Sequence, residues 1–415
     1  MKLTYKHTRI GCYINFFSDA VDNVLLGLLF TTLAAEFDIG IVRLAAISSI
    51  VFGVQAVLIP VASLMTNKIG FRKMAVAMQL FNFIGVAGLG VFPYIFPSPF
   101  IGLSIAAVFF ATGNSICEAI NNPMFEALPL ENKDAEMNRL HSVFSFGQVI
   151  VILVSTLFFV TIGREHWQYL AILFALVSLV NLFIFLKAPL GELVEETNRT
   201  PLGKIISQKL FIILIIILIC NGPVEMCMAN WTSLFAEQGL HVSKTVGDLL
   251  GPCLFAVGMG ISRLFYGVKG AKINLEKAMI YCGFVCFLGY VVVVFSPIPL
   301  LSLIGCGIVG IATGIICPGC VCILAKSFPT GGIPMFGVMI LFQYLGNTVT
   351  NNMIGNVTAY VEKNVPAICL RMFPVTDPYE LGLRTALFFV TILAFIMFVF
   401  IWVAYRYIVK HNISR

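Results

Sequence analysis

Carboxylates and amides recur at helical spacing inside apolar stretches of this chain. In FFSDAVDNVLLG, Asp19 and Asp22 are three residues apart, so on an α-helix they share a face. In ATGNSICEAINNP, Asn114, Glu118 and Asn122 follow at intervals of four and also share a face. An acid surrounded by hydrocarbon favours its protonated form, and two acids on one face can share a proton. The pattern therefore predicts that Asp19, Asp22 and Glu118 bind and release protons, with the asparagines in support.

Two more polar stripes lie in the C-terminal half. CNGPVEMCMANWTSLF places Asn221 and Glu225 four residues apart around Pro223, and FQYLGNTVTNN places Gln343 and Asn347 one turn apart. Pro223 lacks an N–H and is expected to interrupt its helix, which would expose backbone groups to a solute. Amides also offer donors and acceptors to hydroxyl groups. We predict that the substrate-binding residues are Asn114, Asn122, Asn221, Glu225, Gln343 and Asn347. The alternative is that the amides only tie helices together by buried hydrogen bonds.

These residues belong to a chain of 415 residues that is 59% hydrophobic and 11% charged, with a mean hydropathy of +0.97. Because soluble domains carry about 25% charged residues, the composition indicates an integral membrane protein. Hydropathy separates about twelve segments long enough to span a bilayer. The predicted spans are 10–36, 43–66, 74–96, 99–126, 139–162, 166–188, 208–236, 245–268, 275–296, 298–325, 334–361 and 381–408. MKLTYKHTR enters the first span without a cleavage site, so we expect this span to be retained.

The polar stretch GELVEETNRTPLGKIISQK divides the spans into two halves. We predict an N-terminal bundle over 1–188, a cytoplasmic linker over 189–207 and a C-terminal bundle over 208–415. The tripeptide Ala-Thr-Gly at 111–113 recurs at 312–314, and Lys68 recurs as Lys269 at the same offset. These matches favour a parallel repeat. The predicted fold is an all-α membrane protein of twelve transmembrane helices in two pseudo-symmetric six-helix bundles.

The basic residues predict the orientation of the chain. Most of the 26 Lys and Arg residues fall at span ends on the side that holds both termini, so we expect both termini in the cytoplasm. The predicted location is the cell membrane, inner or plasma, with multiple passes. Because the basic residues are scattered, the net charge of +6 does not indicate a nucleic-acid surface. The expected partners are the lipid bilayer, a small solute and protons, and the chain is expected to be a monomer.

Other classes of function lack their residues. The five histidines do not gather into a Ser/His/Asp-like constellation, so an enzyme or a receptor is not favoured. Cys317, Cys320 and Cys322 have no accompanying histidine or second cysteine pair, so we interpret them as apolar filler. No metal and no cofactor are expected.

No lysine or arginine is expected at the same depth in the membrane as the carboxylates.

Two further side chains, Arg263 and Trp231, allow more than one interpretation. Arg263, near the inner end of the eighth span, is predicted to have a structural or gating role. The alternatives are that it contacts the substrate or that it snorkels to the surface. Trp231 is predicted to be an interfacial anchor, the alternative being a stacking platform for the solute.

The hairpin after the second span resembles the loop signature of the major facilitator superfamily. That signature has a glycine, an acid–base pair, a second glycine and basic residues, and SLMTNKIGFRK is similar to it. Ser63 replaces the first glycine, Asn67 the aspartate and Phe71 a basic residue. The resemblance implies a gating or structural role for Asn67, Lys68 and Arg72, and the fold given above. The gating salt bridge of the replaced aspartate is not carried over.

A second stretch resembles the fucose–proton symporter family within that superfamily. The matching residues are Gly113, Glu118, Asn122, Pro123, Asn138, Arg139, Leu140, Ser145, Phe146 and Gly147. GMGISR, residues 258–263, is also similar to a family segment, with Ser262 in place of a glycine. The resemblance implies that Glu118 and a span-one aspartate are the proton-linked acids. Asp22 matches that aspartate best, and Asp19 is its rival.

The resemblance and the polar stripes together favour one function. We expect a secondary active transporter that carries a small polar solute, a sugar, by proton-coupled symport with alternating access. The alternative is a proton-driven exporter, an antiporter of drugs or hydrophobic metabolites, because intramembrane acids serve that activity as well.

Overall fold

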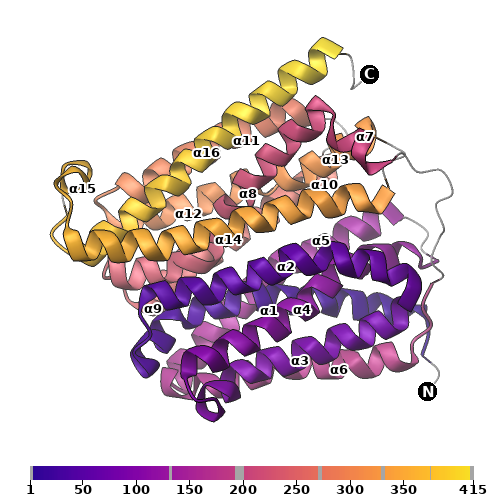
Figure 1. Ribbon diagram of the computed structural model, residues 1–415, viewed down its shortest axis with the longest axis horizontal. Helices are drawn as coiled ribbons and strands as arrows, with labels where there is room; N and C mark the ends of the chain where they lie inside the picture. Colours follow the sequence, from indigo (N-terminus) through magenta and orange to yellow (C-terminus); the bar gives the residue numbers. More distant parts are fainter. Residues whose placement is uncertain are drawn as a thin grey trace. The chain divides into compact units, whose positions relative to one another are not determined.

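The computed structural model describes residues 3–129, 133–191, 201–269, 273–328, 332–373 and 375–411. Within these ranges all regular elements are helices (Figure 1). Eleven helical segments among the described residues are long and apolar enough to cross a membrane. The remaining predicted span, the eleventh (334–361), corresponds to the 33-residue helix α14 (Gly332–Asn364), whose asparagines lower its hydropathy. The predicted all-α membrane fold is therefore confirmed.

The helices of the N-terminal half follow the predicted spans closely. They are α1 (Tyr5–Phe37), α2 (Ile41–Ile69), α3 (Phe71–Ile95), α4 (Pro99–Glu126), α5 (Lys133–Thr161) and, after the short turn η1 (Arg164–His166), α6 (Trp167–Lys187). Gly70 separates α2 from α3 with a φ of 84°, a left-handed conformation that glycine adopts without strain. Pro99 occupies the first turn of α4, where its missing N–H costs no hydrogen bond.

The C-terminal half contains more short elements. In chain order they are α7 (Leu202–Ile206), α8 (Lys209–Leu234), η2 (Phe235–Gly239), α9 (Lys244–Asp248), η3 (Leu249–Cys253), α10 (Leu254–Lys269), α11 (Leu275–Phe295), α12 (Pro299–Thr313), α13 (Ile316–Ser327), α14, α15 (Ala367–Met372) and α16 (Pro378–His411). The turns η2 and η3 are π-helical, and both lie in the connection between α8 and α10.

A broken helix occurs in the tenth predicted span and not in the seventh. The tenth span is divided because α12 ends at Thr313 and α13 begins at Ile316. Pro318 has no N–H, so the carbonyl of Gly314, four residues earlier, loses its helical donor. In contrast, α8 stays helical through Pro223. The interruption that we predicted at Pro223 is therefore wrong.

The chain forms two compact units. The first, called the N-terminal unit below, contains Met1–Leu25 and Ile50–Asn198. The second, called the C-terminal unit, contains Leu26–Ser49 and Arg199–Arg415. The long helices α1 and α2 thus contribute residues to both units. Part of the predicted linker, residues 192–200, lies outside the described residues. The predicted bundle boundaries stay a prediction.

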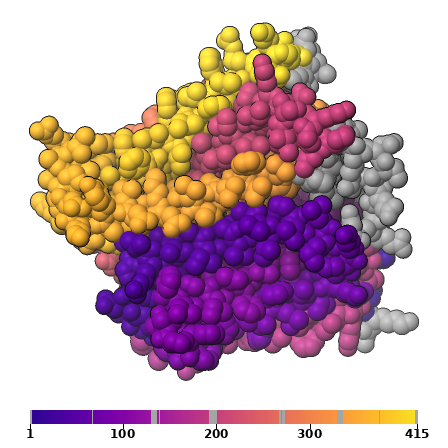
Figure 2. Space-filling view, viewed as in Figure 1, coloured from indigo at the N-terminus to yellow at the C-terminus, as the bar shows by residue number. Residues whose placement is uncertain are grey.

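Both units expose apolar side chains, as helices that face lipid do. In the first unit, α2 exposes Val57, Val61 and Leu64, and its indigo surface is visible in Figure 2. In contrast, the interior of that unit is close-packed, with Cys12 and Phe16 of α1 against residues of α3 and α4. The polar residues singled out above are exceptions within these apolar interiors, so each needs hydrogen-bond partners.

Candidate functional site

The predicted acids of α1 and α4 lie together in the N-terminal unit. Asp19 is 2% exposed, and its Oδ1 accepts hydrogen bonds from the amide nitrogens of Asn114 and Asn23. The Asn23 amide lies 2.9 Å from that oxygen and also donates to the Asp19 carbonyl at 2.8 Å. The Asp19 carboxyl in addition interacts electrostatically with the carboxyl of Glu118. The structure thus brings three of the predicted residues, Asp19, Asn114 and Glu118, into one cluster.

Asp22 borders this cluster but is bonded differently. It is 8% exposed, and it interacts electrostatically with Asp19 and lies near Asn114. Both of its carboxyl oxygens are buried without a hydrogen-bond partner among the described residues. An isolated ionised carboxylate in an apolar interior is very costly, so this geometry suits a protonated acid.

A network of amides holds α1 against three other helices beside the acids. Asn15 lies one turn before Asp19, and its Oδ1 accepts from Gln79 of α3 and from Asn181 of α6, each at 2.7 Å. Its amide nitrogen donates to Asn121 of α4 at 2.9 Å. For these residues the helix-tying interpretation of buried amides fits the structure. Asn15, Gln79 and Asn181 were not among the predicted site residues, although each is an amide within an apolar span.

Two amides near α1 and α4 have unused hydrogen-bonding atoms. Asn122 of α4 is half-buried, and its Oδ1 is buried without a partner in the described residues. Gln148 of α5 is fully buried, and neither atom of its amide has a partner within the same ranges. The preceding residue, Gly147, packs against Ala20 of α1. Gln148 was not among the predicted site residues, because a single glutamine in FGQVIVILV forms no polar stripe.

The C-terminal unit contains a buried ion pair. Glu225 of α8 and Arg263 of α10 approach to 3.3 Å between Oε1 and Nη2, with side chains 5% and 17% exposed. The amide of Asn221 donates to the other oxygen of Glu225 at 3.5 Å. Our expectation that no basic residue lies at the depth of the carboxylates is therefore wrong for Glu225, because α10 brings Arg263 to it.

Arg263 also reaches the break between α12 and α13. Its Nε donates to the carbonyl of Gly314 at 3.4 Å, and this is the carbonyl that Pro318 leaves without a helical donor. Arg263 therefore links α8, α10 and the broken helix. This geometry fits the structural role that we favoured for Arg263, and it does not fit a side chain that snorkels to the surface.

The predicted residues of α14 lie against α8. A Cβ atom added to Gly222 would lie 2.7 Å from both Asn347 and Gln343, so the two helices meet closely at this glycine. Asn347 is 1% exposed, and its Oδ1 has no partner in the described part of the chain. Asn221 has an Oδ1 in the same condition. The C-terminal unit thus holds two buried amide oxygens available as acceptors.

Trp231 is a core residue of the C-terminal unit. It is 1% exposed, and its indole N–H donates to Oδ1 of Asn351 at 2.6 Å. Its ring packs against Phe30, with ring centroids 5.0 Å apart. The predicted role as an interfacial anchor is wrong, because such an anchor would expose its ring at the headgroup level.

Among the hairpin residues Asn67, Lys68 and Arg72, the structure indicates a role for Arg72. Arg72 donates to the carbonyls of Phe185, Leu186 and Ala188 at 2.9–3.0 Å. These are end groups of α6, so Arg72 caps a helix C-terminus with a matching charge. Lys68 is exposed in the last turn of α2. The side chain of Asn67 lies outside the described residues.

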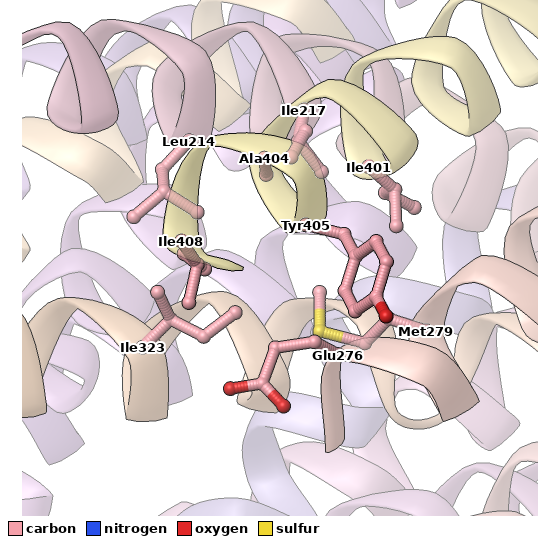
Figure 3. Close-up of a pocket in the computed structure, with 9 residues that line it drawn as sticks. All are labelled: Leu214, Ile217, Glu276, Met279, Ile323, Ile401, Ala404, Tyr405 and Ile408. Carbon is pink, nitrogen blue, oxygen red and sulfur yellow. The ribbon is translucent and has the colours of Figure 1, made fainter. Parts of the chain in front are cut away.

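A small void in the C-terminal unit is not a solute site. Figure 3 shows it among α8, α11, α13 and α16. Its volume of about 10 Å³ would hold roughly one water molecule. Apart from the carboxylate of Glu276 its walls are almost entirely apolar. The residues that line it are Leu214, Ile217, Glu276, Met279, Ile323, Ile401, Ala404, Tyr405 and Ile408.

The cysteine motif does not form a metal cluster in the described residues. Cys317 is half-buried, Cys320 is buried and Cys322 is exposed, so the three thiols do not share one environment. Across the described ranges, no three His, Cys, Asp or Glu side chains are placed to hold a metal ion.

The sequence and the fold of this chain are similar to those of known proteins. The family model described as the Major Facilitator Superfamily matches residues 12–350. No curated protein matches the sequence significantly. Many solved structures share the fold, and three are representative.

The first is a bacterial homologue of the human lysosomal transporter Spinster, with a TM-score of 0.76, 13% identity and 98% of both chains covered. The second is a nucleoside transporter, NupG, with a TM-score of 0.72, 10% identity, and coverage of 94% of this chain and 99% of that one. The third is a D-xylose–proton symporter, with a TM-score of 0.69, 14% identity and coverage of 92% and 97%. At these identities the similarity shows a common fold.

Proposed function

Because the chain belongs to the Major Facilitator Superfamily, we propose that it is a secondary active transporter that carries a small polar solute together with protons. Membership of this family indicates a transporter and not an enzyme. Within the superfamily we propose that the chain resembles the fucose–proton symporters most, on the stretch from Gly113 to Gly147. The proposed solute is a sugar.

The observation that carries the proposal is the acid cluster of the N-terminal unit. Buried Asp19 accepts hydrogen bonds from Asn23 and Asn114 and interacts electrostatically with Glu118. Asp22 is buried beside Asp19, and its oxygens have no donor in the described residues. Carboxyl groups that lie close together in a low-dielectric interior can bind and release protons when water reaches them. This is the property that coupling to a proton gradient requires.

The choice of a hydroxylated solute rests on the amides. Asn122, Asn221 and Asn347 have buried amide oxygens with no partner in the described ranges. Buried acceptors of this kind are costly unless a ligand supplies donors, and sugar hydroxyl groups are such donors. One of the structures with the same fold is a D-xylose–proton symporter, which supports this choice.

The proposed location and orientation in the membrane follow from the distribution of basic residues. We propose a multi-pass protein of the cell membrane, active as a monomer, with both termini in the cytoplasm. We propose that the two bundles, 1–188 and 208–415, provide alternating access, with Asp22 and Glu118 acting in the first and Asn221 and Asn347 in the second.

The test is uptake by the purified protein in proteoliposomes. With the interior alkaline, labelled monosaccharides, nucleosides and a lipophilic dye are offered separately. We expect accumulation of a monosaccharide against its gradient, and a protonophore should abolish it. Accumulation that persists with the protonophore would refute proton coupling, and gradient-driven movement of the dye alone would indicate the antiporter instead.

The binding site is tested by a matched pair of variants on α14. Asn347→Ala removes a buried amide and should weaken binding of the transported solute by roughly tenfold, the equivalent of about 1.4 kcal/mol. Asn352→Ala removes an exposed amide of the same helix, whose nitrogen donates only to the carbonyl of Thr348 in the described structure. It should leave binding unchanged. Equal affinities for the two variants and the wild type would place the site elsewhere.

A further inference from the structure

A basic cleft lies at one end of the C-terminal unit, between the start of α8 and the last turns of α16. Its volume is about 550 Å³, which is in the range of small-ligand sites. The α7–α8 segment and the end of yellow α16 lie at the same end of the unit in Figure 1. The described residues that line the cleft include two lysines and no acid, and they are Ser207, Gln208, Lys209, Tyr407, Lys410 and His411. The cleft is therefore suited to an anion.

The start of α8 adds backbone donors to this charge. An α-helix leaves its first N–H groups without intrahelical partners, and these groups and the helix dipole attract anions. Gln208, which precedes α8, supplies no side-chain cap, and the first turn of the helix holds no acid. The side chains of Ser207 and Gln208 donate instead to the carbonyl of Lys204, at 3.0 and 3.3 Å. The first turn of α8 thus has no side chain of its own that competes with an anionic ligand.

The two lysines of the cleft are not neutralised by neighbouring acids. Within the described ranges, Lys209 and Lys410 are exposed and form no ion pair. Glu276 lines the small void on a different face of α16 and not the cleft. The wall of the cleft on α16 is held in place, because the rings of Tyr407 and His411 stack with centroids 4.2 Å apart. Both positive charges are therefore available to a ligand.

Apolar surface adjoins the cleft on both of its helices. On α16, the exposed residues Phe395, Trp402 and Val409 recur every seven residues and so form one stripe. On α8, Ile212 is exposed one turn after the cleft. An exposed tryptophan is typical of the membrane interface, and Tyr407 lies about 8 Å further along the helix axis than Trp402. The cleft is therefore expected at the level of the lipid headgroups, next to surface that faces acyl chains.

We propose that this cleft binds the phosphate group of an anionic phospholipid of the surrounding membrane, such as phosphatidylglycerol. Lys209 and Lys410 recognise the charge, and the first N–H groups of α8 and the hydroxyl of Tyr407 donate to the phosphate oxygens. The acyl chains lie along the apolar stripe of α16. A zwitterionic lipid carries the same phosphate with its own cation, so it gains less from the two lysines. The site is independent of the proposed solute and of proton coupling.

A simpler interpretation is that these lysines only retain their side of the chain in the cytoplasm, as scattered basic residues do. The two interpretations differ in what happens when charge is removed at chosen places. A lipid site depends on the lysines that line the cleft, whereas general attraction to an anionic surface depends on any exposed lysine. Lys73 and Lys187 are exposed lysines of the N-terminal unit and provide the matched control.

Native mass spectrometry of the purified full-length protein in detergent measures the binding of added lipids. We expect the wild type to bind phosphatidylglycerol roughly tenfold more tightly than phosphatidylcholine. The double variant Lys209→Gln with Lys410→Gln should weaken phosphatidylglycerol binding roughly 25-fold, because each lysine contributes roughly a factor of five. Lys73→Gln with Lys187→Gln removes the same charge and should leave binding unchanged. Equal affinities of the two double variants would overturn the proposal.

Two further measurements use the wild-type protein, so they do not depend on the folding of a variant. Raising the ionic strength from about 50 to about 500 mM should weaken the binding of phosphatidylglycerol and not that of phosphatidylcholine. Binding that is insensitive to salt would contradict recognition by the lysines. Glycerol 3-phosphate offers a phosphate without acyl chains, and we expect it not to displace the lipid. Displacement at equal concentration would show that the cleft takes a soluble phosphate ester, and the assignment to a membrane lipid would be wrong.

Discussion

Single residues decide whether the proposed coupling works, and Glu118 is the first to test. Glu118→Gln keeps the shape of the side chain but cannot release a proton. We expect it to abolish accumulation of solute driven by a pH gradient, with solute exchange across the membrane retained in part. Both activities are measured in proteoliposomes. Glu126→Gln is the control, because Glu126 is an exposed acid on the same helix. Full accumulation by Glu118→Gln would rule out its coupling role.

The ion pair of the C-terminal unit makes a prediction about stability. Arg263→Ala leaves the buried carboxylate of Glu225 without its cation, and breaking such a pair costs about 3–5 kcal/mol. We expect a clearly lower unfolding temperature in detergent. The double variant Arg263→Ala with Glu225→Gln should recover part of the loss, because it removes the uncompensated charge. A single variant as stable as the wild type would show that the pair contributes nothing.

The buried acids were easier to predict from the sequence than their interaction partners. Asp19, Asp22 and Glu118 were identified because a charge inside an apolar span is conspicuous in the sequence. The contact of Glu225 with Arg263 was missed because it joins α8 to α10, and depth along a span does not reveal which helices are neighbours. Gln148 was missed because burial without partners is a property of packing that no residue spacing records.

At the scale of elements, the approach of α8 to α14 depends on glycine. A Cβ atom at Gly346 would overlap the carbonyl oxygen of Ile219, which is the carbonyl that Pro223 leaves without a helical donor. Gly346→Ala should therefore force the helices apart and cost about 1–3 kcal/mol. Thermal unfolding in detergent measures the loss. Gly337→Ala on the same helix meets no atom within 4 Å and should not destabilise. Equal stability of both variants would refute this packing.

Helix boundaries were predictable from hydropathy, whereas helix breaks were not. Pro223 and Pro318 look alike in the sequence, yet α8 continues through the first and the chain breaks near the second. The two sites differ in the contacts of the carbonyl group that each proline leaves without a helical donor. Gly346 packs closely against the carbonyl of Ile219, whereas the carbonyl of Gly314 accepts a hydrogen bond from Arg263. Such partners come from other helices, so a single segment cannot indicate them.

At the scale of the whole molecule, the number of spans and the class of fold follow from composition, because a bilayer demands long apolar helices. The division into two compact units is harder to predict from the sequence. α1 and α2 each contribute to both compact units, since contacts and not chain order decide the grouping. Orientation in the membrane is the remaining prediction at this scale, and the basic residues make it testable.

Basic side chains are retained on the cytoplasmic side, and Lys187, Lys204 and Lys209 surround the connection between α6 and α8. We therefore expect this connection in the cytoplasm and the turn at Gly163, between α5 and α6, outside. Alkaline phosphatase is active only outside the cytoplasm, so a fusion after Gly163 should be active and one after Gly191 inactive. Green fluorescent protein fused at the same two positions should give the opposite result. An active phosphatase after Gly191 would invert the topology. It would also place the end of α6 that Arg72 caps on the outer side, against the charge distribution from which the orientation is inferred.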